Sequence, residues 1–187
     1  MNILITSAGR RVSLVRSFKN ELAKIAPNGK VYATDSSPVL SAACQIADAC
    51  FKVPQLDEPD YIDILLGFCK THVIRLIVPT IDTELLELAK NKDRFAEQGV
   101  AIVISSIDFV AKCRNKRLIH KLFEHYNVKV AKEYTKDNYK LPLFIKPIDG
   151  SRSVDTYIIK VADDLTEYHF SNDKLMFLEY LNHEEYD

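Results

Sequence analysis

The sequence of 187 residues contains little glycine and proline, 5 of the first and 7 of the second. This scarcity excludes a collagen-like repeat and a low-complexity chain. Long apolar runs are absent too, because stretches such as 76–79 and 102–104 fall far short of the roughly 20 residues that cross a bilayer. The chain opens without a basic region or a cleavable apolar stretch. We therefore expect a cytoplasmic protein with no membrane partner.

Neither sign of charge dominates the chain. Lys and Arg number 25 and Asp and Glu number 26, so the formal net charge is −1. The basic residues form no stripe of the kind that phosphate-backbone binding requires, and we expect no nucleic-acid partner. With 47% hydrophobic and 27% charged residues, the composition is typical of an ordinary globular protein.

The four cysteines, at positions 44, 50, 69 and 113, form no CxxC pair and have no histidine at metal-ligand spacing. The sequence therefore predicts no metal site. In a chain without an export signal the simplest interpretation is that all four are buried free thiols.

Up to about residue 105 the sequence alternates between two kinds of hydrophobic period. Short β-rich runs are separated by helical patterns of ten or more residues, and crossovers of that length favour parallel pairing. We predict an α/β fold with an open, Rossmann-like parallel sheet covered on both faces. The expected strands are 2–6, 30–35, 50–53, 75–79 and 100–105, and the expected helices run from about 15 to 25, 61 to 70 and 82 to 91.

After residue 105 the pattern changes to α+β. Asn115 is a candidate N-cap for a helix with apolar residues at 118, 119, 122, 123 and 126. Short strand candidates follow near 130–134, 143–147, 156–161 and 175–181, with one helix around 163–170. We predict two domains, residues 1–110 and 111–187.

The first segment with chemical potential is the strand-to-helix turn at residues 6–11. Backbone N–H groups at a helix start hold anions, and Arg10 and Arg11 beside Gly9 reinforce that preference. Asp35 ends the next strand, near where a dinucleotide fold places its ribose-binding acid. Only one of the three glycines of that fingerprint is present. The turn thus has three interpretations: a dinucleotide site, an arginine site for the carboxylate or phosphate of a small ligand, or a plain tight turn.

At the same predicted sheet edge lie Asp82 and Glu84, which follow the strand ending at Pro79. Open α/β sheets bind their ligands at this edge.

The second segment is an apolar strand that delivers one lysine, Lys146, and leads into a loop with Gly150, Ser151 and Ser153. A lysine on a buried strand is costly unless it meets an anion. The loop offers unhindered N–H groups and hydroxyl donors, which suit a polyphosphate. The alternative is a hairpin turn after an edge-strand lysine.

The third segment is the apolar strand 175–181 with the acidic tail behind it. Its backbone could read an adenine edge at Glu179, Tyr180 and Leu181, and Glu185 could accept hydrogen bonds from ribose hydroxyls. The alternative is a strand followed by a solvated end.

In this order and spacing the three segments resemble the ATP-grasp superfamily, specifically the branch similar to the large subunit of carbamoyl-phosphate synthase. The resemblance covers nearly the whole chain. It is carried by residues 3–11, 33–35 and 113–116, and by Val-Pro-Thr-Ile-Asp-Thr-Glu-Leu at 78–85. It implies a Rossmann-like pre-ATP-grasp domain followed by the small α+β lobe of an ATP-grasp fold, which ends at the adenine hinge.

The resemblance also implies roles for single residues. Lys116 matches the first basic residue on the ATP phosphates, and Lys146 matches the strand lysine on the α- and β-phosphates. The remaining matches are the flexible phosphate loop (Gly150, Ser151, Ser153), the adenine hinge (Glu179, Tyr180, Leu181) and the ribose acid (Glu185).

The chain departs from the family pattern at Val154 and Asp155, where the family has a glycine after the loop serines. The family also places its Mg²⁺ ligands in a large lobe that would follow residue 187. The resemblance thus implies the N-terminal part of an ATP-dependent carboxylate–amine ligase with ATP and Mg²⁺ as cofactors, an acyl-phosphate intermediate and no catalytic residue in this chain. We expect the chain to be inactive alone.

The implied partners are a small-molecule carboxylate, a second copy of the chain, or a separate chain carrying the large lobe. Two alternatives remain: a Rossmann-like module that binds a dinucleotide or small anion, and a non-catalytic piece that completes a site on a partner chain.

Overall fold

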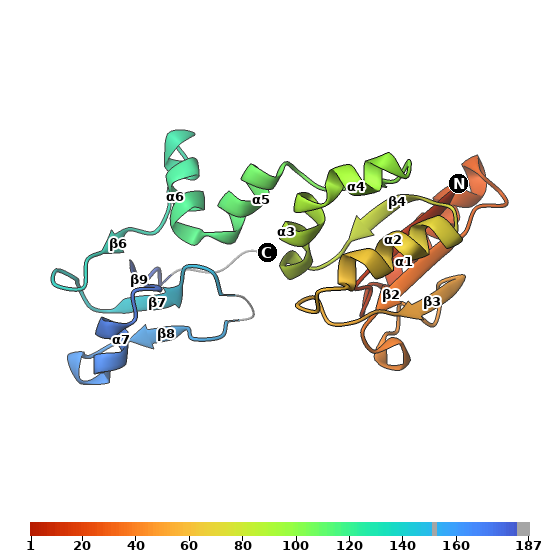
Figure 1. Ribbon diagram of the computed structural model, residues 1–187. Helices are drawn as coiled ribbons and strands as arrows, with labels where there is room; N and C mark the ends of the chain where they lie inside the picture. The colour runs from red at the N-terminus through yellow and green to blue at the C-terminus, as the bar shows by residue number, and fades with distance from the viewer. Residues whose placement is uncertain (151–152, 183–187) are drawn as a thin grey trace. The chain divides into compact units, whose positions relative to one another are not determined.

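The computed structural model describes residues 1–150 and 153–182. The chain divides into two compact units, Met1–Val110 and Ala111–Asp187. Figure 1 shows the elements of both. Among the described residues, no helix is both long enough and apolar enough to cross a membrane.

Unit 1 contains a five-stranded parallel sheet in the order β3-β2-β1-β4-β5. The strands are β1 (Asn2–Thr6), β2 (Val31–Asp35), β3 (Ala49–Lys52), β4 (Ile74–Pro79) and β5 (Ala101–Ile102). The helices are α1 (Val12–Ile25), η1 (Pro38–Leu40), α2 (Tyr61–Thr71), α3 (Asp82–Lys90) and α4 (Lys92–Glu97). A further helix, α5 (Ile107–Arg114), begins in unit 1 and ends in unit 2.

Alternate side chains of β1 build the two halves of the core. Ile3 and Ile5 pack with Val15 and Leu22 of α1 on one face. Leu4 packs on the other face, in the cluster that contains residues of α2, α3 and α4. Because strand side chains alternate between faces, the predicted sheet with both faces covered is confirmed.

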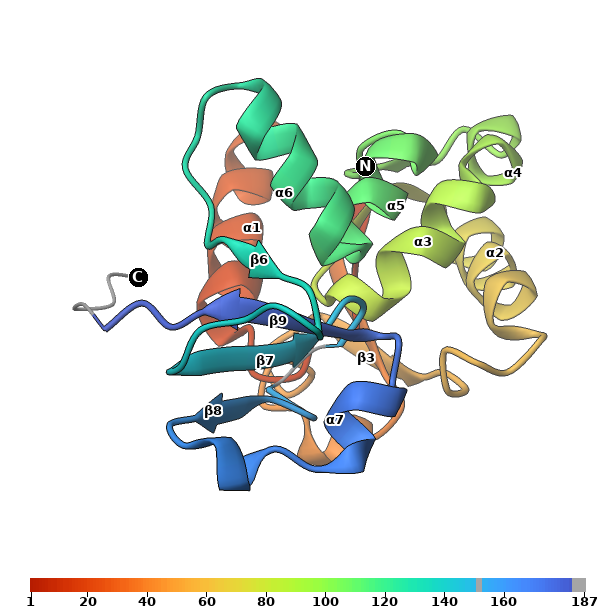
Figure 2. The same cartoon turned by 90° about the vertical axis from the view of Figure 1, so that its left-hand side faces the viewer.

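Unit 2 contains a four-stranded antiparallel sheet in the order β6-β9-β7-β8, which is easiest to follow in Figure 2. The strands are β6 (Glu133–Tyr134), β7 (Leu143–Pro147), β8 (Tyr157–Ile159) and β9 (Leu175–Glu179), and the helices are α6 (Lys116–His125), η2 (Ala162–Asp164) and α7 (Glu167–Ser171). The expected α+β character of this part is therefore confirmed.

Several local expectations need correction. The helix expected over 82–91 is present as α3, which ends at Lys90, but a further helix that was not expected, α4, begins at Lys92. Between them the Asn91 side chain donates a hydrogen bond to the Glu87 carbonyl. α5 occupies residues that sequence reasoning treated as a domain boundary. The apolar stripe of α6 is not a core face: none of its residues is buried, and Leu118 is 42% exposed.

The expectation of four buried free thiols is wrong. Cys44 and Cys50 form a disulfide, and Cys113 is exposed; only Cys69 is a buried free thiol. The pair escapes sequence reasoning because β3 returns beside β2 and brings residue 50 back to the segment that follows η1.

Candidate functional site

The start of α6 fixes Lys116 against the segment that follows β7. The Asn115 side chain accepts hydrogen bonds from the backbone N–H groups of Arg117 and Leu118, as an N-cap does. The backbone N–H of Lys116 then donates to the Ile148 carbonyl at 2.8 Å, and its ammonium donates to the Gly150 carbonyl at 2.6 Å. The helix start and the candidate phosphate loop are thus joined by two direct contacts.

Lys146 lies on β7 opposite Met176 of β9 and is half-buried. Burial lowers the pKa of its ammonium, and the positive charge of Lys116 lowers it further. Burial also lowers the pKa of His120 on α6, and the positive charge of Lys146 lowers it further. The structure therefore brings basic groups of α6 and β7 close enough to repel one another, an arrangement that an anion would stabilise.

The described part of the candidate loop is tightly built. A Cβ atom on Gly150 would come within 2.4 Å of the Pro147 ring, so this position excludes a side chain unless the ring moves. Ser153 has φ +54°, a left-handed conformation. Ser151, predicted as part of the phosphate loop, lies outside the described residues.

Asp155 shows how the chain replaces the glycine that the family resemblance led us to expect after the loop serines. Its φ of +59° lies in the left-handed region that glycine favours and that Asp tolerates better than most residues. Its carboxylate accepts hydrogen bonds from the hydroxyls of Tyr157 and Tyr168, each at 2.6 Å. These two bonds lower the pKa of Asp155. The far end of the loop is thereby anchored to β8 and α7.

The predicted adenine hinge lies at the end of β9. The backbone N–H of Glu179 donates to the Lys132 carbonyl at 2.9 Å, and its carboxylate accepts from the Lys132 N–H at 2.9 Å. Tyr180 follows the strand half-buried and Leu181 is exposed. Since Glu179 already bonds within unit 2, adenine reading stays a prediction chiefly for the backbone of Tyr180 and Leu181. Glu185, the predicted ribose acid, lies outside the described residues.

The turn at Gly9, Arg10 and Arg11 is closed by contacts within unit 1. Gly9 has φ +47°, and its N–H donates to the Asp35 carboxylate at 3.0 Å. The Arg11 guanidinium donates to the Thr80 carbonyl at 3.4 Å, while Arg10 is exposed. The Gly9 amide is thus bonded to a carboxylate of the chain itself, and an anion at this turn would have to displace Asp35 or use other N–H groups. The anion site stays a prediction.

A buried carboxyl, Glu84, lies at the same edge of the sheet. It is 0% exposed and accepts hydrogen bonds from the hydroxyls of Thr6 at 3.0 Å, Ser7 at 3.1 Å and Tyr61. Burial raises its pKa despite these three donors, and burial also raises the pKa of the Tyr61 phenol. Sequence reasoning placed Glu84 at this edge but missed its partners, because no local signal links positions 6, 61 and 84.

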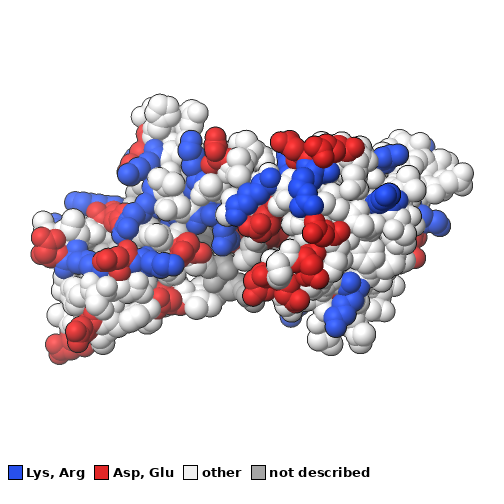
Figure 3. All heavy atoms as spheres, in the orientation of Figure 1, with Lys and Arg blue, Asp and Glu red and all other residues white. Residues whose placement is uncertain are grey.

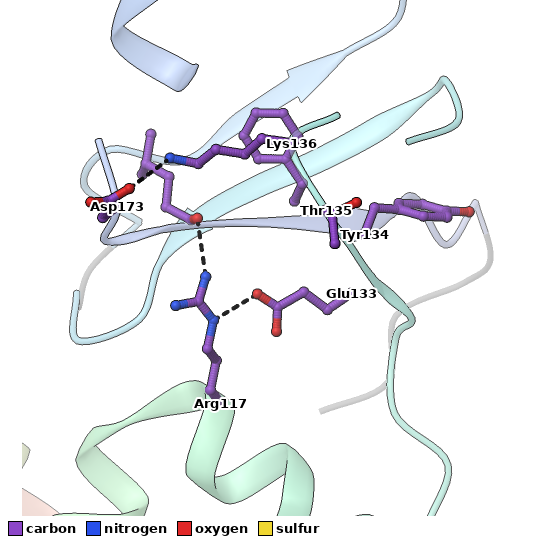
Figure 4. A pocket seen from close by; sticks show the side chains of 8 residues that line it. Arg117, Glu133, Tyr134, Thr135, Lys136 and Asp173 are labelled. Atoms are coloured by element: carbon purple, nitrogen blue, oxygen red, sulfur yellow. Dashed lines mark hydrogen bonds and ion pairs between the residues drawn. The ribbon is translucent and has the colours of Figure 1, made fainter. Parts of the chain in front are cut away.

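A further cavity of about 660 Å³ lies in unit 2 between the start of α6 and the β6–β9 pair (Figure 4). The Arg117 guanidinium donates to Glu133 at 2.7 Å and to the Leu175 carbonyl at 3.4 Å. The Lys136 ammonium donates to the Phe170 and Asn172 carbonyls. Both cations are therefore engaged by the chain. On the face of this unit that Figure 3 shows, basic and acidic side chains are interspersed.

Comparison with known proteins identifies the family of this chain. The model of the PylC-like N-terminal domain matches residues 3–103, which is more than half of the chain. The chain therefore belongs to the PylC-like N-terminal domain family. No curated protein matches it.

Solved structures extend the likeness of this PylC-like chain to both units. The biotin carboxylase domain of Hydrogenobacter thermophilus 2-oxoglutarate carboxylase, with MgADP and bicarbonate, shares 12% identity at a TM-score of 0.70 over 96% of this chain and 44% of its own. Campylobacter jejuni biotin carboxylase in an ATP complex shares 15% identity at a TM-score of 0.66, over 96% of this chain and 45% of its own. Rhizobium etli pyruvate carboxylase shares 18% identity at a TM-score of 0.65, over 97% and 18%.

At these identities the structures show the fold alone: a Rossmann-like pre-ATP-grasp sheet followed by the small α+β lobe. The PylC-like chain spans less than half the length of these three chains.

Proposed function

We propose that this PylC-like chain is the N-terminal part of an ATP-dependent carboxylate–amine ligase of the ATP-grasp type, resembling the large subunit of carbamoyl-phosphate synthase. The observation that carries the proposal is the contact of the Lys116 ammonium with the Gly150 carbonyl of the candidate phosphate loop, at 2.6 Å, beside Lys146, whose pKa the charge of Lys116 lowers. A nucleotide polyphosphate carries negative charge that both ammonium groups would attract.

The described residues fit such a group in three respects. The charge of Lys116 on α6 reaches Lys146 on β7 and lowers its pKa. The Lys116 ammonium bonds Gly150 of the candidate phosphate loop, and β9, which ends at the proposed adenine hinge, pairs with β7 in the same sheet. The nucleotide, when bound, supplies the phosphoryl group that activates a carboxylate for attack by an amine. Lys116 and Lys146 then hold and neutralise the phosphates.

Within residues 1–150 and 153–182, no three or more His, Cys, Asp or Glu residues form a group that could hold a metal ion. One similar solved structure was obtained with MgADP. We propose Mg²⁺ as a cofactor of the intact ligase and assign it no role among these residues.

The proposal is tested by titrating the 187-residue chain with ATP while the lysine side-chain NMR signals are followed. We expect weak, saturable shifts of the Lys116 and Lys146 signals and no hydrolysis. Lys116→Met and Lys146→Met each weaken binding about tenfold or more. Lys160→Met removes the same charge from an exposed position of unit 2 and leaves binding unchanged.

Tight ATP binding, or ADP release by this chain alone, would show that the chain is more than the proposed part. Equal effects of Lys160→Met and Lys146→Met would mean that binding reflects general charge and not this site. A search for a co-purifying chain and a measurement of oligomeric state test the proposed partners, a separate large lobe or a second copy. A panel of small carboxylates offered to the intact protein tests the substrate class.

A further inference from the structure

A second cavity, of about 190 Å³, lies within unit 1 and shares no residue with the proposed nucleotide site. Its walls come from the residues that directly follow four neighbouring strands. Ser7 follows β1, Asp35 and Ser36 stand at the end of β2, and Ile81 follows β4. Residues 53–56 follow β3, and Tyr61 begins α2. This is the carboxyl edge of the sheet, where open parallel sheets bind ligands.

The polar wall of this cavity is rich in hydrogen-bond acceptors. The Ser7 hydroxyl gives its proton to Glu84, so its oxygen has only lone pairs to offer a ligand. The Tyr61 hydroxyl gives its proton to Glu84 as well. Each carboxylate oxygen of Asp35 accepts one backbone N–H, from Gly9 and from Ser37, and a carboxylate can accept about four hydrogen bonds. A ligand that bonds Ser7, Tyr61 and Asp35 must therefore bring donors.

The charge and the apolar wall of the cavity restrict the class of ligand further. Among the described residues that line the cavity, Asp35 is the one charged group, so the complementary ligand is a cation. Val53, Pro54, Leu56 and Ile81 supply an apolar wall for methylene groups. The volume is several times the ~30 Å³ that one water occupies in the liquid, which leaves room for a short alkyl chain.

Ser7 carries a backbone signal of its own. Its φ is +51°, a left-handed conformation that is uncommon for a residue with a side chain. Strained positions of this kind cluster at ligand sites, where the surrounding structure holds them. Here the contacts to Glu84 and the hydrogen bonds from Thr80 to the Thr6 and Ser7 carbonyls hold it.

We propose that this cavity binds a primary aliphatic ammonium ion, with Asp35 as its counter-ion and the Ser7 hydroxyl oxygen as an acceptor. The site belongs to unit 1 alone and does not require nucleotide. Its failure would therefore leave the Lys116–Lys146 proposal untouched, and the reverse also holds.

The test is an NMR titration of the full chain with n-pentylammonium chloride, with 1-pentanol and sodium pentanoate as matched neutral and anionic probes. We expect saturable shifts of the backbone amides of Gly9 and Ser37, because both donate to Asp35. Pentanol and pentanoate should bind at least tenfold more weakly. Asp35→Asn should reduce ammonium affinity by a similar factor.

Asp35→Asn also removes an acceptor from Gly9 or Ser37, so a second variant is needed. Gln55 lines the cavity and is exposed, and Gln55→Lys places a competing ammonium at its rim. It should weaken binding at least tenfold. Gln98→Lys makes the same change at an exposed position away from the cavity and should have no effect. The proposal is overturned if pentanoate binds as well as pentylammonium, if no shift saturates, or if the two lysine variants behave alike.

Discussion

The carboxyl group of Glu84 accepts a hydrogen bond from the Thr6 hydroxyl at 3.0 Å across 78 positions of the sequence. This contact joins the end of β1 to the first turns of α3, and the hydroxyls of Ser7 and Tyr61 complete the environment of the same carboxyl. Because this carboxyl is so deeply buried, the stability of the fold should depend on whether it is protonated.

Stability should fall as pH rises above the ordinary range of glutamate. Burial raises the pKa of Glu84 in the folded chain above 4.5, so between these two pKa values the folded state holds a proton that the unfolded state has released. The free energy of unfolding then decreases with pH by at most about 1.4 kcal/mol per pH unit. Below the unfolded pKa this contribution is fully present, and above the folded pKa it is lost.

Glu84→Gln should remove that slope. Chemical denaturation from pH 4.5 to 8 measures it, and Glu87→Gln, at a partly exposed position of the same helix, is the control that should keep the wild-type slope. A Glu84→Gln profile that runs parallel to wild type would mean that Glu84 titrates normally.

Two glycine-to-alanine substitutions should change the free energy of unfolding in opposite directions. A Cβ on Gly29 would lie 2.6 Å from the Met1 carbonyl oxygen and 2.9 Å from that of Ala26, so we expect Gly29→Ala to cost about 1–3 kcal/mol. Gly67 lies inside α2 with nothing within 4 Å, so Gly67→Ala should stabilise by about 0.5–1 kcal/mol. Thermal unfolding of both variants checks the pair, and two changes of the same sign would contradict it.

The two lysines of the proposed phosphate site should report on each other. Lys116→Met should move the pKa of Lys146 back up toward 10.5, because it removes the positive charge that lowers it, while the effect of burial remains. An NMR pH titration of the Lys146 side chain measures this shift, with Lys160→Met as the charge-matched control. If the Lys146 pKa is unchanged in Lys116→Met, the two ammonium groups do not interact, and the proposed function loses its basis. Inorganic tripolyphosphate should raise the same pKa in the wild-type chain.

The N-cap of α6, the helix that begins at Lys116, should contribute to the stability of unit 2. Asn115→Ala leaves the N–H groups of Arg117 and Leu118 without their side-chain acceptor, which should destabilise unit 2 by about 1 kcal/mol. Asn115→Asp keeps an acceptor and adds a favourable charge at a helix start, so it should be close to wild type. Denaturation curves of the two variants decide; an Asn115→Ala chain as stable as Asn115→Asp would show that the cap contributes nothing.

Much of the fold was determined by local sequence. The predicted strand at 143–147 coincides with β7, and Asn115 caps α6 as its residue type indicated. The alternation of short apolar runs with helical patterns led directly to the parallel sheet of unit 1. These features follow from backbone preferences and from the period of apolar residues, and both act over a few positions.

Tertiary structure alone decided which polar groups meet. The sequence placed Asp35 at a strand end, but only the pairing of β1 with β2 brought its carboxylate within hydrogen-bond distance of the Gly9 N–H. The same packing buried Glu84, a residue type that is seldom fully buried, and paired Cys44 with Cys50. Such contacts join residues brought together by chain crossovers, and their energies depend on burial and on partners that no local pattern encodes.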